Sequence, residues 1–227
     1  MKIETVLFDF DLTLINLKLV DSTDWMKVRK EVASYYNANG VPASVTTRYE
    51  LPLGLYEGIH RTQRGKFQPE KFSAIQKKAS ELLKEKYEEK GLRNAVRIPG
   101  AKEILKWVKE RDLNVGVVSL NSEKIIKKVA EKKELKDYID VFFGRDSPGN
   151  PKPSEDQIEN CLKKFGSQPD EALMVGDSPS DVEVSNNAGV ISVALEGDYY
   201  SKEELVQADP DYIIDNLRKL KKIESGE

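Results

Sequence analysis

Short apolar runs separated by helical segments constrain the fold of this chain more than any other feature. Runs of this length, rich in β-branched residues, are typical of strands buried on both faces of a sheet. Amphipathic segments such as residues 100–112 and 154–166 lie between them. The β-α-β-α order predicts an α/β protein with a doubly wound, mostly parallel sheet. The six runs are IETVLFD (3–9), NVGVVS (114–119), YIDVFFG (138–144), ALMVG (172–176), GVISVAL (189–195) and DYIID (211–215).

Within residues 154–166, the helix carries signals for both of its ends. Ser154 and Gln157 have the spacing of a capping box, and Gly166 is placed as a helix stop. Cys161 is the only cysteine of the chain, which excludes an internal disulfide. We expect Cys161 at a buried or half-buried position of this helix.

The strand pattern is interrupted over residues 16–91. The stretch 37–69 is rich in Gly, Pro and hydroxyl residues and predicts loops with room for one short helix. We expect a helical cap over residues 16–91, inserted into a discontinuous core made of residues 1–15 and 92–227. Two amphipathic helices are predicted in the cap from their apolar spacing, one with Trp25, Val28, Val32 and Tyr35 or Tyr36, the other with Phe72, Ile75, Ala79, Leu82, Leu83 and Tyr87.

Composition limits the kinds of partner. The formal net charge is −3, from 36 basic and 39 acidic residues, which gives no overall bias towards nucleic acid. The sequence has no run of about 18 apolar residues to span a membrane, and acids interrupt MKIETVLFDFD where a signal peptide needs an apolar core. We expect a cytoplasmic location. The charged fraction of 33%, dominated by Lys and Glu, is typical of proteins from hot environments, although mesophiles also have charge-rich helices.

Polar side chains gather where the predicted strands end. Ligands of open α/β sheets bind beyond the carboxyl ends of the strands, so we expect these side chains to form one acidic cluster with an ammonium and a hydroxyl. Carboxylate oxygens are the ligands that Mg²⁺ prefers. The single histidine, His60, lies in the insert, which argues against a zinc site and against a Ser-His-Asp hydrolase. The cluster consists of Asp9, Asp11, Ser119, Lys152, Asp177 and Asp181.

Four motifs in this order resemble the signature of the haloacid-dehalogenase superfamily. DFDLT (9–13) resembles its DxDxT motif, and Ser119, Lys152 and GDSPSD (176–181) look like its second, third and fourth motifs. The insert after the first motif is similar to the helical cap of the phosphoglycolate phosphatase-like and β-phosphoglucomutase-like branch. The resemblance implies a Rossmann-like core and a Mg²⁺-dependent phosphatase acting on a small phosphorylated metabolite.

The resemblance also implies roles for the matching acids. Asp9 would attack phosphorus and form an aspartyl-phosphate, while Asp11 would protonate the leaving oxygen and then activate water. Asp9, the Asp11 backbone carbonyl and Asp177 would hold Mg²⁺, with Asp181 nearby. These roles agree with the charges, because a phosphate dianion cannot approach a carboxylate until cations offset the repulsion.

Further residues would bind the phosphoryl oxygens. The resemblance assigns this role to Ser119 and Lys152, joined by backbone N–H groups around Phe10 and Leu120. Three positions depart from the family pattern: Leu12 where glycine is usual, Asn16 where many members have Asp, and Leu120 inserted between Ser119 and Asn121. They remove no reacting group, but they leave the substrate subgroup open.

Each of these residues also has a structural interpretation. Asp9, Asp11 and Asp177 would be caps or loop acids, and Ser119 would be the N-cap of a helix near Ser122. Lys152 would be a solvated loop lysine, and Asp181 would act only as its partner. The Thr13 hydroxyl would either cap a turn or orient Asp9.

The segment GIHRTQRGK (58–66) in the cap concentrates His60, Arg61, Arg64 and Lys66. We interpret it as a loop between helices that reads an anionic substrate, with a solvated cationic surface as the alternative. Two other functions stay open: a sugar phosphomutase of the same fold, and a non-catalytic subunit that uses the fold as a scaffold. The substrate, and the choice between a monomer and a homodimer, also stay open.

Overall fold

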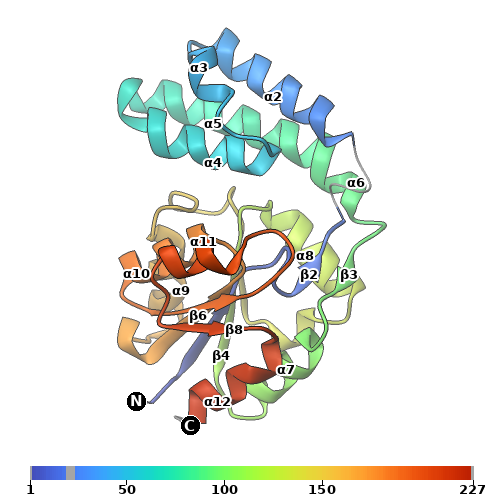
Figure 1. Cartoon of the computed structure of the whole chain (residues 1–227), viewed down its shortest axis with the longest axis vertical. Helices are drawn as coiled ribbons and strands as arrows, with labels where there is room; N and C mark the ends of the chain where they lie inside the picture. The colour runs from blue at the N-terminus through green and yellow to red at the C-terminus, as the bar shows by residue number, and fades with distance from the viewer. Residues whose placement is uncertain (1, 19–23, 226–227) are drawn as a thin grey trace.

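Six parallel strands form the central sheet. The computed structural model describes residues 2–18 and 24–225, and the sheet has the strand order β5-β4-β1-β6-β7-β8 (Figure 1). Its pairings are all parallel. Each strand falls inside one predicted apolar run, so the predicted α/β fold class is confirmed. The strands are β1 (Thr5–Phe8), β4 (Asn114–Val118), β5 (Val141–Phe143), β6 (Ala172–Gly176), β7 (Ile191–Leu195) and β8 (Tyr212–Ile214).

Helices cover both faces of this sheet because successive strand residues point to opposite sides. Val6 and Phe8 of β1 pack in one apolar cluster with α7 and α8, whereas Leu7 packs in another with α9 and α10. Cys161 of α9 is buried in the second cluster, as expected. The helices of the core are α7 (Ala101–Lys109), α8 (Glu123–Lys132), α9 (Asp156–Phe165), α10 (Pro179–Ala188), α11 (Lys202–Gln207) and α12 (Leu220–Ser225), with 3₁₀ turns η3 (Lys136–Tyr138), η4 (Pro169–Glu171) and η5 (Leu217–Lys219).

The two ends of α9 turned out differently from each other. Gly166 ends the helix in the left-handed conformation with φ 73°, as predicted. The predicted capping box is wrong, because the N-cap is Glu155 and its side chain makes no cap bond. The Ser154 hydroxyl instead donates to Asp156 Oδ1 at 2.6 Å, and Gln157 donates to the Gly144 carbonyl at 2.7 Å. A nearby carboxylate therefore competes successfully for the capping hydroxyl.

A separate layer of helices lies above the core in Figure 1. The two predicted amphipathic helices are present as α2 and α5, and Tyr36 of α2 is fully buried. Trp25 and Tyr35 are partly buried against the same apolar cluster, which extends from this layer into the core. The elements of the layer are α2 (Trp25–Ala38), α3 (Ala43–Thr46), α4 (Pro52–Gln63), η1 (Arg64–Lys66), α5 (Pro69–Leu83), the π-helix η2 (Lys84–Glu88) and α6 (Glu89–Gly91).

The prediction of loops for residues 37–69 is wrong in extent. This stretch contains the twelve-residue helix α4 as well as α3. Gly54 and Gly58 lower the helix propensity of α4, but Gly58 has a packing function. A Cβ atom there would come within 2.0 Å of the Tyr49 ring, so only glycine lets that ring lie against the helix. Tertiary packing thus stabilises a helix that local propensity does not favour.

A two-stranded antiparallel ribbon connects the helical layer to the core. β2 (Ile15–Asn16) pairs with β3 (Val96–Arg97), so that Ile15 lies opposite Arg97 and Asn16 opposite Val96. The chain therefore leaves the core and returns to it side by side. Strands of two residues are too short to produce a periodic pattern, and the sequence did not predict them. The division of domains at residues 15/16 and 91/92 stays a prediction.

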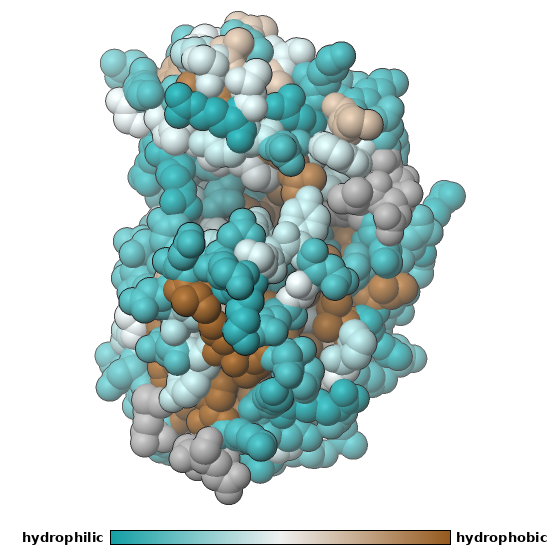
Figure 2. Space-filling view, viewed as in Figure 1, coloured by the Kyte–Doolittle hydropathy of each residue, from teal (hydrophilic) through white to brown (hydrophobic). Residues whose placement is uncertain are grey.

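Polar side chains dominate the face of the molecule that Figure 2 shows. Hydrophilic residues cover most of the face shown in Figure 2, and hydrophobic residues gather mainly over the core. Within residues 2–18 and 24–225, no helix combines the length and apolarity needed to cross a membrane.

Candidate active site

Three buried carboxylates meet at the carboxyl end of the sheet. Asp9 follows β1, Asp177 follows the neighbouring strand β6, and Asp181 lies in the first turn of α10. One carboxylate oxygen of each lies within 4.8 Å of the others. Gly176 makes room for this arrangement, because a Cβ atom there would come within 2.2 Å of Asp181 Cβ. The donor set consists of hard oxygens and fits a divalent cation.

Lys152 is the ammonium within this cluster. Its Nζ donates to Asp9 Oδ1 and to Asp181 Oδ1, each at 2.6 Å, and the residue is only 3% exposed. Burial acts to lower the pKa of Lys152, but the carboxylates of Asp181 and Asp9 outweigh it and raise the pKa. Lys152 is thus no solvated loop lysine. One fixed cation faces three acids and cannot balance all of them when they are ionised.

Asp181 has two structural partners besides its place in the cluster. Its Oδ1 accepts from Lys152, and its Oδ2 accepts from the Ser178 hydroxyl at 2.6 Å. Ser178 Oγ in turn accepts from the Asp181 N–H at 3.2 Å, which completes a capping box at the start of α10. These bonds fix the orientation of the carboxylate that faces Lys152.

Burial perturbs the acids strongly. It raises the pKa of Asp9 to about 7, although the Lys152 ammonium acts in the opposite direction. It also raises the pKa of Asp11 to about 7, and the pKa of Asp177 rises well above its usual value through burial and then through the charges of Asp181, Asp9 and Asp11. Because these carboxyls cannot all ionise together, a bound cation would relieve their repulsion.

A tight turn after Asp9 positions Asp11 and Thr13. Leu12 has φ 66°, in the left-handed region that favours glycine, and its N–H donates to the Ile15 carbonyl at 2.6 Å. Leu12 thus adopts this conformation at the position where the resemblance leads us to expect glycine. Asp11 Oδ1 accepts from the Leu17 N–H at 2.8 Å. The Thr13 hydroxyl donates to Asp177 Oδ1 at 3.3 Å and so orients Asp177. One of our two expectations had been that it would orient Asp9.

Ser119 lies next to Asp9 at the end of β4. It is buried and acts to lower the pKa of Asp9, while its hydroxyl donates to Asn121 Oδ1 at 3.2 Å. The N-cap of α8 is Ser122, so Ser119 is not the cap that the alternative interpretation required. The Leu120 carbonyl accepts from the Arg145 guanidinium at 2.8 Å. Phe10, also buried, follows Asp9, and its carbonyl accepts from Leu14 and Ile15.

The cationic segment of the cap lies on α4 and η1 instead of on a loop. Arg61 forms an ion pair with Glu183 of α10 at 2.7 Å and a longer one with Glu57 at 3.5 Å. His60 is buried and Arg64 is exposed; both line a cavity between α4, α5 and the segment 145–151. Of the four residues that we expected to act together, His60 and Arg64 line this cavity, whereas Arg61 pairs with Glu183 of the core.

Further polar residues near the cluster were not predicted. Glu57 of α4 accepts from the Ser180 hydroxyl of α10, and its pKa is raised by burial. Burial also raises the pKa of Tyr87, and the charge of Asp11 adds to the shift. Tyr200 shows the same effect, first from burial and then from Glu57 and Asp177. Charged and aromatic residues are so frequent in these segments that no signal in the sequence marks these particular ones.

A second buried ion pair joins the helical layer to the core. Arg145 and Glu88 form it, with both side chains fully buried. Arg145 Nε donates to Ser80 Oγ at 2.9 Å and NH2 donates to the Ser80 carbonyl at 2.8 Å. Glu88 Oε2 accepts from both the N–H and the hydroxyl of Ser122, at 3.2 and 2.8 Å. The network connects α5 and η2 to the segment that carries Ser119.

The chain belongs to the haloacid dehalogenase-like hydrolase family, whose sequence profile matches residues 6–195. The prediction of a hydrolase of this superfamily is thereby confirmed. The chain is 31% identical, over its full length and 96% of the relative, to a putative pyrophosphatase PpaX from Caldanaerobacter subterraneus subsp. tengcongensis. It is 27% identical, over 96% of its length and 95% of the relative, to a phosphoglycolate phosphatase from Vibrio vulnificus.

Solved structures show the same fold. A putative phosphoglycolate phosphatase from Lactobacillus delbrueckii subsp. bulgaricus superposes with a TM-score of 0.69 over 100% of both chains, at 17% identity. A predicted phosphoglycolate phosphatase from Haemophilus somnus superposes with a TM-score of 0.66 over 98% of both, at 20% identity. At these identities the comparison establishes the fold alone.

Proposed function

We propose that this protein is a Mg²⁺-dependent phosphatase that hydrolyses a small phosphorylated metabolite through an aspartyl-phosphate. The observation that carries this proposal is the contact of Lys152 with Asp9 inside a cluster of three buried carboxylates. A carboxylate beside an ammonium at the end of a central strand can attack phosphorus while the ammonium offsets charge on the phosphoryl oxygens. The matching family and the names of the relatives agree with this chemistry.

Asp9 is the nucleophile in this proposal. Its carboxylate displaces the alcohol of the substrate and forms a phosphoryl-oxygen bond, while the P–O bond to the leaving group breaks. Asp11, with its pKa raised by burial to about 7, can donate a proton to the leaving oxygen near neutral pH. The same residue then takes a proton from the water that hydrolyses the acyl phosphate. Free phosphate leaves and Asp9 is regenerated.

The phosphoryl oxygens are held by groups that surround Asp9. Lys152 already contacts the Asp9 carboxylate, and Ser119 lies beside it and acts to lower the pKa of Asp9. Backbone N–H groups around Phe10 and Leu120 complete the set in our proposal. The Arg145 bond to the Leu120 carbonyl holds the segment after β4 in place.

Asp9, Asp177 and the Asp11 backbone carbonyl would hold Mg²⁺, with Asp181 beside them. The donor set fits, because the three clustered carboxylates are buried and have one ammonium, that of Lys152, to balance them. When bound, the ion would neutralise part of the charge of the phosphate and its attacker. Thr13, through its bond to Asp177, would keep that carboxylate oriented.

The names of the relatives and the predicted cap support a class of substrate. Relatives named phosphoglycolate phosphatase and pyrophosphatase PpaX align over nearly the whole chain, and we propose a substrate of comparable size, with selectivity set by the cap over residues 16–91. No nucleic-acid or membrane partner is part of this proposal. Location in the cytoplasm and the state as monomer or homodimer remain predictions.

The experiment that tests the function is turnover of p-nitrophenyl phosphate. We expect activity with Mg²⁺, loss of activity after dialysis against EDTA, and recovery when Mg²⁺ is added back. Trapping with acid followed by mass spectrometry should find the phosphoryl group on Asp9. Full activity in excess EDTA, or a phosphoryl group on another residue, would contradict the proposal. A panel of phosphorylated metabolites would then identify the preferred substrate.

A further inference from the structure

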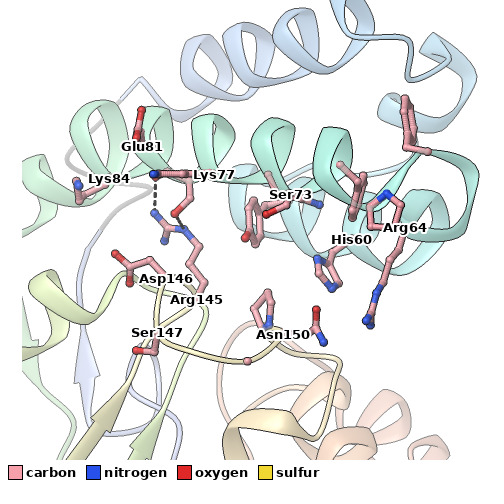
Figure 3. Close-up of a pocket in the computed structure, with 18 of the residues that line it drawn as sticks. His60, Arg64, Ser73, Lys77, Glu81, Lys84, Arg145, Asp146, Ser147 and Asn150 are labelled. Atoms are coloured by element: carbon pink, nitrogen blue, oxygen red, sulfur yellow. Dashed lines mark hydrogen bonds between the residues drawn. The ribbon is translucent and has the colours of Figure 1, made fainter.

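A cavity of about 790 Å³ lies between the helical layer and the core. Helices α4 and α5 line it from one side and the segment 145–151, between β5 and α9, lines it from the other. Figure 3 shows His60, Arg64, Ser73 and Lys77 on the helical side, with Arg145 and Asn150 on the core side. This volume is in the range of sites that bind small organic molecules.

The cavity is separate from the carboxylate cluster. None of Asp9, Asp11, Ser119, Lys152, Asp177 and Asp181 is among its lining residues. Arg145 lines the cavity and at the same time donates to Glu88 and to the Leu120 carbonyl. The Arg145–Glu88 network therefore stands between the cavity and the segment that carries Ser119.

Two buried side chains in the cavity wall have polar atoms that lack a protein partner. Both ring nitrogens of His60, and Nε2 of Gln76, find no hydrogen-bond acceptor or donor among residues 2–18 and 24–225. His60 is 8% exposed and Gln76 is 6% exposed. Gln76 Oε1 already accepts from the Tyr36 hydroxyl at 2.8 Å, so the remaining capacity of Gln76 is as a donor. Buried donors of this kind call for an oxygen acceptor.

The charge and shape of the wall define the ligand further. Four cationic residues, Arg64, Lys77, Lys84 and Arg145, line the cavity against two acids, Glu81 and Asp146. Three aromatic side chains contribute apolar surface: Tyr56, Phe67 and Phe72. Phe67 stacks on Phe72 with ring centroids 5.9 Å apart, and His60 lies 5.7 Å from Phe72. An anionic head would meet the cations, and an apolar body would meet these rings.

From this combination we infer that the cavity is a binding site for a small organic anion with an apolar body, whose oxygens accept hydrogen bonds from Gln76 and His60. Such a ligand contacts α4 and α5 on one side and the segment 145–151 on the other, so it ties the helical layer to the core. Two sources supply this chemistry. The ligand is either the leaving-group portion of a long substrate or a separate molecule that regulates the enzyme.

The test uses 1-anilinonaphthalene-8-sulfonate, an organic anion with an aromatic body, as a fluorescent probe. We expect saturable binding to the parent protein and to the Asp9→Asn variant alike, so this readout does not depend on phosphatase activity. The double variant Arg64→Gln/Lys77→Gln should raise the probe Kd at least about fivefold, because it removes two charged partners. Lys30→Gln is the control, since Lys30 is exposed on α2 and does not line the cavity.

A second variant tests the buried donor. Gln76→Leu should also raise the probe Kd by about fivefold or more, with its melting temperature measured to show that the protein is folded. If Gln76→Leu does not fold, the double variant Arg64→Gln/Lys77→Gln still tests the inference, because both of its residues are exposed. A probe Kd that changes by less than twofold in the double variant, or by the same factor in Lys30→Gln, overturns the inference.

Steady-state kinetics with p-nitrophenyl phosphate distinguish the two sources. If the cavity receives part of the substrate, the probe raises KM and leaves kcat unchanged. If it receives a separate ligand, the probe changes kcat and binds with the same Kd when the substrate is saturating. Either pattern supports the site, provided that it is lost in Arg64→Gln/Lys77→Gln. Inhibition that persists undiminished in that variant places the probe elsewhere and overturns the inference.

Discussion

Lys152 and Arg145 are both buried cations on the segment between β5 and α9, yet their surroundings differ. Lys152 contacts two carboxylates directly and a third lies in the same cluster. Arg145 faces a single carboxylate, Glu88, and its other bonds go to neutral oxygens of Ser80 and Leu120. Three carboxylates around the one ammonium of Lys152 indicate a place for a further cation and for phosphate chemistry. The one-to-one pairing of Arg145 with Glu88 indicates a structural role in holding the two layers together.

The largest effect is expected where charge is in excess. Asp9→Asn should lower kcat by at least about a thousandfold, because it removes the attacking carboxylate but keeps the shape of the side chain. The free energy of unfolding without metal should not fall, since the variant removes one of several buried, mutually repelling acids. Turnover assays and urea denaturation measure the two quantities. Asp170→Asn, at an exposed acid, is the control for loss of one carboxylate. Activity within tenfold of the parent would rule out Asp9 as the nucleophile.

At the Arg145–Glu88 pair, where the two charges balance, we expect a loss of stability. Arg145→Met should lower the free energy of unfolding by about 3–4 kcal/mol, because Glu88 is left as a buried charge without its cation. The double variant Arg145→Met/Glu88→Gln should recover much of this loss. Urea denaturation at neutral pH gives the free energies for a double-mutant cycle.

Arg48→Met is the matched control for this cycle, since Arg48 is exposed. It should change the free energy of unfolding by less than about 0.5 kcal/mol. If Arg145→Met were as stable as Arg48→Met, the Arg145–Glu88 pair would not be a structural joint.

His60 extends the comparison to a buried titratable group without a hydrogen-bond partner among the described residues. Burial, with Arg64 adding to it, lowers the pKa of His60 from 6.5 to about 4. As the pH is lowered, the His60 imidazole therefore binds its proton in the unfolded chain before it does so in the folded protein. Stability is lost as the pH falls from about 6.5 towards 4. When the pH is lowered from 7 to 4.5, we expect the free energy of unfolding to fall by about 2 kcal/mol more in the parent than in His60→Leu. Because the chain has one histidine, parallel stability curves for the two proteins would show that His60 is not responsible.

The smallest effect is expected at the exposed contact between the helical layer and α10. Arg61 and Glu183 have side chains that are 43% and 42% exposed, so solvent screens their attraction. Arg61→Ala should lower the free energy of unfolding by less than about 1 kcal/mol, with a coupling to Glu183→Ala of about 0.5 kcal/mol. Raising the salt concentration should reduce that coupling further. A coupling as large as that of Arg145 with Glu88 would remove the distinction between exposed and buried contacts.

The sequence predicted the sheet and the cluster for the same physical reason. Buried parallel strands need short β-branched runs, and all such strands end at one edge, so Asp9 and Asp177 had to converge. Lys152 precedes α9, and it was identified in the sequence only by its place in the order of the four motifs. Its direct bonds to Asp9 and Asp181 agree with that interpretation.

Long-range polar contacts were beyond the reach of the sequence. Arg145 and Glu88 are separated by 57 positions, and nothing distinguishes Glu88 from the many other acids of a charge-rich helix. Helix α4 was missed because its glycines suggest a loop, while the contact of Gly58 with Tyr49 appears only in three dimensions. The same limit applies to Thr13, whose bond to Asp177 spans 164 positions.

The β2–β3 ribbon has a consequence for how this chain can be cut and rejoined. Since Asn16 and Val96 lie opposite each other in an antiparallel pair, a tight turn such as Asn-Gly inserted between them would close the ribbon into a β-hairpin. The chain would then lose residues 17–95 without any strand of the main sheet changing its register. The ribbon thus places the two chain ends of the helical layer one strand spacing apart, so a different segment whose ends lie equally close could be joined to the core backbone at the same place, although it would also have to replace Glu88 as the partner of Arg145.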